Sequence, residues 1–69
     1  MTHRLIIHSP GTSITIDSDN IDKLNTLSDF CKKNLEAYHA SENFEELTID
    51  ALNRKKTSEL YSMIHQLGL

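Results

Sequence analysis

The chain has 69 residues, a formal net charge of −3 and a single cysteine. A chain of this length predicts one domain, residues 1–69, whose core supplies only ~3–5 kcal/mol of stability unless another copy, a metal or a disulfide adds to it. One cysteine excludes an internal disulfide and therefore a secreted disulfide-stapled scaffold. The mild acidity does not mark the chain as a polyanion binder, so a nucleic-acid site would have to be local.

The N-terminal sequence indicates a cytoplasmic protein. Residues 1–4 lack the charged, apolar and small-residue pattern of a signal peptide. The longest apolar run near this end covers residues 5–7, which is far too short to span a membrane. We therefore expect a cytoplasmic location and no membrane partner.

The segment "RLIIHSPGTSITID", residues 4–17, predicts a β-hairpin. Pro10 and Gly11 are typical of a turn, and β-branched residues flank them on both sides. In the second strand Ile14 and Ile16 alternate with polar residues, which gives that strand one apolar face. The hairpin should bury this face.

Ile6 stands out in the first strand of this hairpin. Leu5 and Ile7 match the apolar face of the second strand, so Ile6 must point to the opposite face. An apolar residue on the outer face indicates that the face is partly covered or meets another chain. Ile6 is therefore a candidate protein-binding residue.

A long amphipathic helix is expected after the hairpin. It should begin within residues 17–20, whose side-chain oxygens can cap free backbone N–H groups, and end near residues 39–41. Its apolar stripe recurs at steps of three and four residues. The stripe consists of Ile21, Leu24, Leu27, Cys31, Leu35 and Tyr38.

The segment "SENFEELTIDALNRK", residues 41–55, is compatible with two structures. Asn43 and Glu46 have the spacing of a helical capping box, and the helix-forming residues around them favour a short helix. The alternation of Leu47, Ile49 and Ala51 with polar residues instead indicates a third strand near Leu47–Asp50. Propensity favours the helix, and the strand remains the alternative.

The last helix carries signals at both ends. Thr57 or Ser58 is expected to cap its start, and its apolar stripe should contain Leu60, Tyr61, Ile64 and Leu67. Gly68 is placed as a left-handed residue after the helix, with Leu69 folding back on Ile64 in a Schellman motif. The expected fold is therefore α+β, with a hairpin packed on one long helix and two shorter helices after it.

Arg54, Lys55 and Lys56 form the only cluster of basic residues before this helix. Their position is that of the turn in a helix-turn-helix protein, with Ala51 as the small residue of the first helix. Glu59 argues against that assignment, because it would place a carboxylate at the phosphate-facing helix start. A solvated charged loop before the helix explains the same residues without any nucleic acid.

Other chemistry-bearing residues have structural explanations. Cys31 lies between Leu27 and Leu35 on the buried stripe, which indicates a structural thiol. His39 and His65 fall in the expected last turns of helices, where imidazole interacts favourably with the carbonyl end. We therefore predict a non-enzymatic protein without a metal or cofactor.

The function that remains after this elimination is binding. We expect a small protein that binds another protein and modulates it, as an inhibitor, adaptor or accessory subunit, through Ile6, Tyr61 and Met63. The last two lie at the end of the chain, and Met63 is off the main apolar stripe. The alternative is a small DNA- or RNA-binding regulator that uses Arg54, Lys55 and Lys56 with the last helix.

Self-association is also expected. A two-stranded sheet has two open edges, and its first strand carries three consecutive apolar residues, Leu5, Ile6 and Ile7. If residues 47–50 are not a strand, the hairpin of a second copy can cover that strand and form a four-stranded sheet about a two-fold axis. This predicts a homodimer that an Ile6→Lys change would shift toward monomer.

Overall fold

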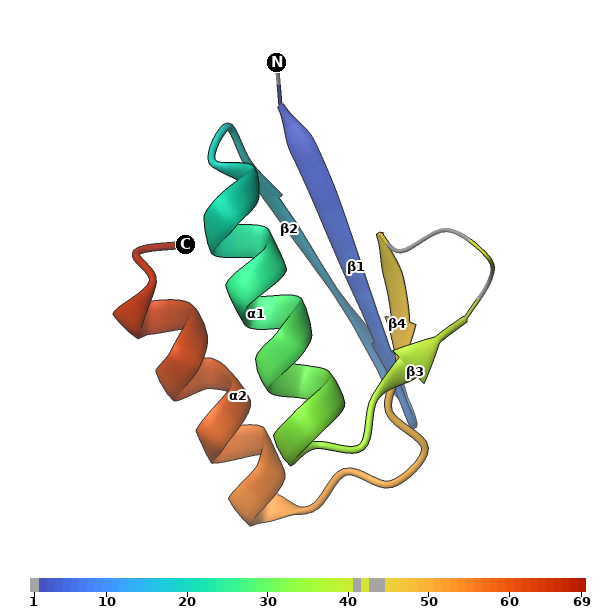
Figure 1. The fold of residues 1–69 in the computed structure, drawn as a ribbon. Coiled ribbons are helices and arrows are strands. Elements are labelled where there is room, and N and C mark those ends of the chain that lie inside the picture. Colours follow the sequence, from blue (N-terminus) through green and yellow to red (C-terminus); the bar gives the residue numbers. More distant parts are fainter. Residues whose placement is uncertain (1, 41, 43–44) are drawn as a thin grey trace.

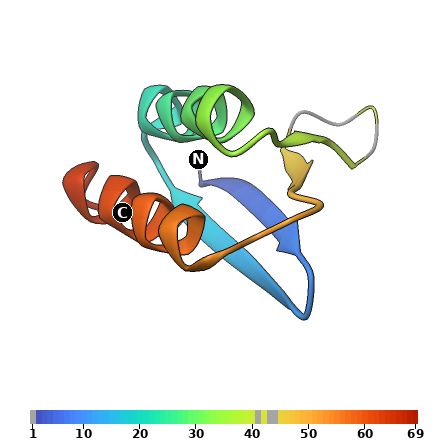
Figure 2. The same cartoon turned by 90° about the horizontal axis from the view of Figure 1, so that it is seen from below.

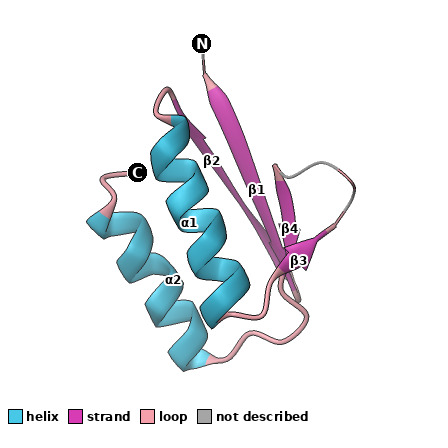
Figure 3. Ribbon diagram, viewed as in Figure 1, coloured by secondary structure: helices cyan, strands magenta, loops and turns pink. Residues whose placement is uncertain are grey.

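The computed structural model describes residues 2–40, 42 and 45–69, which form two layers (Figure 1). The elements in chain order are β1 (His3–Ser9), β2 (Thr12–Ser18), α1 (Ile21–Asn34), β3 (Tyr38–His39), β4 (Glu46–Thr48) and α2 (Arg54–Gln66). The strands make one sheet, and both helices lie on the same face of it (Figures 2 and 3). The predicted α+β class is confirmed, whereas the prediction of three helices is wrong: the described residues contain two.

The hairpin forms as predicted and pairs without a bulge from His3↔Ser18 to Ser9↔Thr12. Gly11 in its turn has φ +83°, a conformation that costs glycine little and other residues much more. Leu5 and Ile7 pair with Ile16 and Ile14 and face the helices. The alternation of apolar and polar residues thus set which face of the hairpin is buried.

Residues 46–48 are a strand, so the favoured prediction of a helix in this segment is wrong. β4 pairs in parallel with β1, with Leu47 opposite Ile7, and the sheet order is β2-β1-β4-β3. Leu47 and Ile49 are almost completely buried. Burial of alternate residues against β1 outweighs the helix propensity of the segment. Asn43 of the expected capping box, and Phe44 beside it, lie outside the described residues.

This strand also changes the premise of the predicted dimer. Because β4 covers one side of β1, β1 is a central strand and the hairpin is not an isolated two-stranded sheet. The outer strands are β2 and the two-residue β3. Ile6 therefore does not lie at an open edge, and any pairing with a second copy has to use an outer strand.

Helix α1 starts within the predicted segment and ends earlier than predicted. Asn20 caps it, because its Oδ1 accepts from the backbone N–H groups of Asp22 and Lys23. The helix stops at Asn34 instead of continuing to residues 39–41. Glu36 has φ +57° and turns the chain away, and the Ala37 N–H closes the end on the Cys31 carbonyl at 3.0 Å. The next residues can then enter β3.

Helix α2 begins at Arg54, and its cap is Asn53 rather than Thr57 or Ser58. Asn53 Oδ1 accepts from the Lys56 N–H at 2.9 Å. The three basic residues consequently form the first turn, although cations are unfavourable at the positive end of a helix dipole. The cap-forming side chains of Thr57 and Ser58 and the acidic Glu59 had indicated a later start. The observed Asn53 cap instead fixes the start of the helix at Arg54.

The predicted end of α2 is confirmed. Gly68 has φ +72° and its N–H donates to the His65 carbonyl at 3.0 Å. The Leu69 N–H donates to the Ile64 carbonyl at 3.1 Å. These two bonds define a Schellman motif, which satisfies carbonyl groups that the helix leaves free.

The core lies between the sheet and the two helices. Leu5, Ile7 and Leu47 of the sheet are buried in it together with residues of both helices. The fully buried larger side chains are Ile7, Leu27, Leu35, Leu47, Ile49, Leu60 and Cys31. α1 supplies most of the helical side of this core, and Leu60 is the buried residue of α2.

Replacing Asn53 by alanine is expected to lower the free energy of unfolding by about 0.5–2 kcal/mol, because it removes the acceptor for the Lys56 N–H. Ser58→Ala is the matched control, since Ser58 is exposed and lies inside the helix rather than at its cap. Urea unfolding followed by circular dichroism measures both. A larger loss for Ser58→Ala than for Asn53→Ala would contradict the cap.

Candidate protein-binding surface

The face of the sheet that points away from both helices is the main surface that the fold leaves uncovered (Figure 2). Since side chains alternate along a strand, the residues next to the buried Leu5, Ile7 and Leu47 point to this side. We call it the open sheet face. Its side chains are Arg4, Ile6 and His8 of β1, Ser13, Thr15 and Asp17 of β2, and Glu46 and Thr48 of β4.

Ile6 points to the open sheet face, as its position in the strand predicts, but it lies in the middle of that face rather than at an edge. It pairs with Thr15 on one side and Glu46 on the other, and it is partly exposed. It is the apolar member of a face that is otherwise built from polar side chains on these three strands. The structure thus places Ile6 where a partner could bury it without disturbing the core.

Polar pairs hold the side chains around Ile6 in place. At one end Arg4 Nε donates to Asp17 Oδ1 at 2.8 Å, and this carboxylate raises the pKa of Arg4. At the other end His8 Nδ1 lies 3.0 Å from Ser13 Oγ, and His8 Nε2 lies 3.8 Å from Glu46 Oε2. An apolar centre with an ordered polar rim is the usual composition of a protein interface.

Tyr38 extends this surface, and the sequence did not predict it there. Its place on the expected helical stripe is wrong, because it lies in β3 opposite Thr48 and 47% of it is exposed. Its hydroxyl donates to Asp50 Oδ1 at 2.7 Å, and this bond raises the pKa of Tyr38. Its neighbour His39 was likewise expected in a helix and lies in β3. The sequence signal that could have indicated this position was the alternation of Leu47 and Ile49, which predicts the strand β4. Once β4 forms, Tyr38 can pair with Thr48.

Tyr61 and Met63, the other two predicted binding residues, do not share a surface with Ile6 or with each other. Successive residues of a helix are turned by about 100°, so these two side chains stand about 160° apart around α2. Tyr61 is 53% exposed. Met63 is partly buried and packs against the core. Ile6, Tyr61 and Met63 therefore do not form one binding site, because each lies on a different part of the surface.

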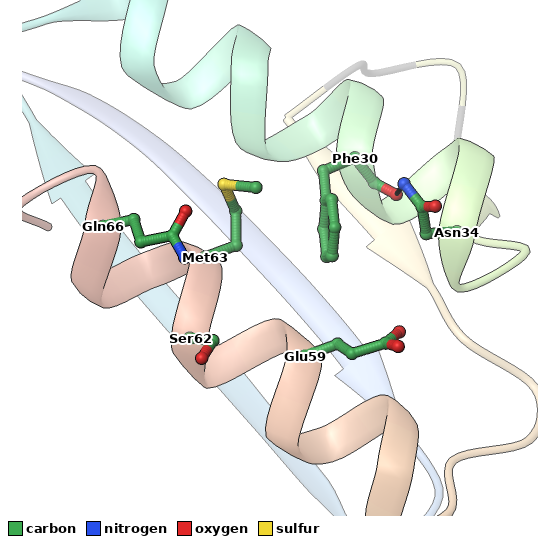
Figure 4. A pocket seen from close by; sticks show the side chains of 6 residues that line it. All are labelled: Phe30, Asn34, Glu59, Ser62, Met63 and Gln66. Carbon is green, nitrogen blue, oxygen red and sulfur yellow. Dashed lines mark hydrogen bonds between the residues drawn. The ribbon is translucent and has the colours of Figure 1, made fainter.

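Met63 lies in a groove between the helices (Figure 4). Phe30 of α1 and Met63 of α2 point toward each other across it, and polar side chains surround them (Figure 4). The lining residues are Phe30, Asn34, Glu59, Ser62, Met63 and Gln66. Its two apolar lining residues, Phe30 and Met63, are partly buried and pack against the core.

The basic cluster does not belong to a helix-turn-helix motif. Ala51 lies outside any helix, and residues 45–53 contain the strand β4 and no helix, so they do not form the first helix of that motif. Lys56 folds back, with its Nζ 3.4 Å from the Ala51 carbonyl and 4.0 Å from Glu36 Oε2. Arg54 and Lys55 are exposed in the first turn of α2.

The fold does bring further cations to the same end of the molecule. Lys32 and Lys33 are in the last turn of α1, and the first turn of α2 lies at that same end (Figure 1). Five of the seven basic residues thus gather at one end, together with the carboxylates of Glu36 and Glu59. The sequence brings together only Arg54 to Lys56, and the fold adds Lys32 and Lys33 to them.

The Cys31 thiol is buried, as predicted. Burial raises its pKa to about 11, which at neutral pH makes the reactive thiolate about a hundredfold rarer than at the ordinary value of 9.0. In the described part of the chain, no three His, Cys, Asp or Glu side chains are grouped so that they could hold a metal ion.

A thiol reagent is expected to label Cys31 slowly at neutral pH and at the unfolded rate once urea is added. Because the folded-state pKa is the higher one, the stability linked to this thiol is full below about pH 9 and is lost as the pH rises through about 11. Unfolding free energies measured between pH 8 and 11 should therefore fall more for the wild type than for Cys31→Ala. Rapid labelling of native protein at neutral pH would contradict burial.

Neither described helix has the length and apolar character needed to cross a membrane. Comparison with protein families, with curated proteins and with solved structures found no match to this chain.

Proposed function

We propose that this protein binds another protein through the open sheet face and modulates it from the cytoplasm, without catalysing a reaction. The observation that carries this proposal is the arrangement around Ile6. A partly exposed apolar side chain is centred among ordered polar pairs, on a face that neither helix covers. Such a face offers a partner apolar area at its centre and hydrogen-bonding groups at its rim.

The exposed aromatic ring of Tyr38 supports the same surface. Tyrosine contributes large contact area at a low cost in side-chain entropy and is enriched where binding energy is concentrated. Its hydrogen bond to Asp50 fixes the ring before any partner arrives. Ile6 and Tyr38 are separated by β4 on one face, so a single partner can contact both.

The test is capture of a partner from a cell lysate by tagged wild-type protein and by two variants, with nuclease added in parallel. Ile6→Lys should abolish capture, since it places a charge at the centre of the proposed surface. Ser62→Lys is the matched control, because Ser62 is exposed on α2, on the helical side of the molecule. Equal capture by folded Ile6→Lys would move the site away from this face.

A second candidate is binding of DNA or RNA by the basic end. The specific observation in its favour is that Lys32 and Lys33 lie at the same end as Arg54, Lys55 and Lys56. Phosphate contacts of this kind weaken steeply as salt rises. Fluorescence anisotropy with duplex and single-stranded probes at low salt should show binding that an Arg54→Glu and Lys55→Glu double variant loses. An absence of binding at low salt would remove this candidate.

A further inference from the structure

The long outer edge of β2 has no partner among the described residues. Ile6 donates its N–H to the Glu45 carbonyl at 2.8 Å, and the His8 carbonyl accepts from the Ile49 N–H at 2.8 Å. Ile6 and His8 thus direct their backbone groups to the β4 side. Since this direction alternates along a strand, Leu5 and Ile7 direct theirs to β2.

The same alternation identifies the free backbone groups of β2. Ile14 and Ile16 are opposite Ile7 and Leu5, so they bond to β1. Ser13, Thr15 and Asp17 therefore direct their N–H and C=O groups outward. The strand is seven residues long, contains neither proline nor lysine and pairs with β1 without a bulge. Outer strands normally avoid pairing by being short or by carrying a proline, a lysine or a bulge, and β2 has none of these features.

The β2 strands of two copies overlap over all seven residues in one antiparallel register, the one centred on Thr15. If two copies of β2 run antiparallel with Thr15 opposite Thr15, then Ser13 faces Asp17 of the other copy and each outward N–H meets an outward C=O. Centring the pair on Asp17 would place two carboxylates opposite each other, which is unfavourable. Centring it on Ser13 would run the pairing into the turn at Gly11. The register centred on Thr15 has neither defect.

The side chains favour the same register. Ile14 lies on the helical side and is only partly buried, and in this register it is opposite Ile16 of the other copy. The contact would extend the core across the junction. Thr15 meets Thr15 on the open sheet face, a pair that stabilises strand pairing. Asp17 keeps its ion pair with Arg4 and faces a serine.

Tyr61 supplies a second point of contact above the strands. α2 lies over the β2 side of the sheet and α1 over the other side (Figure 2). Glu59 and Met63 line the flank of α2 next to α1, so Tyr61 stands on the flank away from α1. In a continuous sheet, the space beyond that flank is occupied by α2 of the second copy. This accounts for an exposed aromatic ring that the isolated chain leaves unused.

We propose that two copies of this chain associate through β2, in the antiparallel register centred on Thr15, to form one continuous sheet. The two-fold axis is perpendicular to the sheet, so the open sheet faces of both copies lie on the same side. This inference does not depend on the function proposed above. It differs from a dimer formed through β1, because β1 is a central strand.

Sedimentation equilibrium between micromolar and near-millimolar concentration tests the dimer. The wild type should reach twice the 7.9 kDa mass of the chain, with a melting temperature that rises with concentration. Thr15→Pro should remain at 7.9 kDa, because it removes an outward N–H without removing a bond to β1. Thr15→Val keeps that N–H and should still dimerise. Ile6→Lys, on the central strand, should also leave the dimer intact.

Amide hydrogen exchange on the wild type gives a readout that does not depend on how the variants fold. The Ser13, Thr15 and Asp17 amides should gain protection as concentration rises, whereas those of Ile14 and Ile16 should be protected throughout. A wild type that stays at 7.9 kDa up to near-millimolar concentration would overturn the proposal and leave the edge to a strand of a different protein. Dimerisation of Thr15→Pro equal to that of the wild type would overturn the assigned edge.

Discussion

Replacing Leu47 by alanine is expected to lower the free energy of unfolding by about 2–5 kcal/mol, one of the two largest losses we predict for a single substitution. Leu47 has 0% exposure and is the central residue of β4, opposite Ile7 of β1. Truncation leaves a cavity between the sheet and the helices that a close-packed core fills only in part. Since a domain of this size has only ~3–5 kcal/mol to lose, much of the protein should be unfolded at 37 °C.

Thr48→Ala is the matched control for that measurement. Thr48 is the next residue of the same strand and its side chain is on the open sheet face, so the loss should stay below about 1 kcal/mol. Urea unfolding at one low protein concentration compares the two without a contribution from association. If the two losses were equal, residues 46–48 would not form a half-buried strand.

Leu60→Ala should lower the free energy of unfolding by a similar ~2–5 kcal/mol, for a different reason. Leu60 is the fully buried residue of α2, so it supplies the main contact by which this helix is held against the rest of the core. Its loss should free α2 before the sheet opens. Circular dichroism should then show a loss of helical signal at urea concentrations where the Ile14 and Ile16 amides, which bond to β1, remain protected.

Ser62→Ala is the control on the same helix, because Ser62 is exposed and alanine favours a helix. It should leave stability unchanged or raise it slightly. If Leu60→Ala and Ser62→Ala unfolded at the same urea concentration, α2 would be held by contacts other than Leu60.

The local elements of the fold could be predicted from the sequence wherever one signal dominated. The hairpin followed from its Pro10-Gly11 turn and its alternation, and the end of α2 followed from Gly68. The segment at Leu47 carried two opposed signals, a helical propensity and a strand alternation. Pairing with β1, which is about 40 residues away in the sequence, decided between them. No local pattern contains that contact.

The candidate site could be predicted only in part for the same reason. Ile6 could be predicted because side chains alternate along a strand, so it must point away from the face that Leu5 and Ile7 bury. That alternation can be read from the sequence of one strand alone. Tyr38 was missed because it matched the helical stripe, whereas Glu36 with its positive φ ends the helix before it. The free edge of β2 was also hidden, because the position of β4 determines which strand of the hairpin is the outer one.

The most direct test of the proposed function is site-specific photocrosslinking in cells. A benzophenone side chain is placed at Ile6 on the open sheet face in one variant, and at Ser62 on α2 in the other. We expect a crosslinked product with another protein from the Ile6 variant, which nuclease does not remove, and none from the Ser62 variant. A partner crosslinked from Ser62 but not from Ile6 would contradict the account.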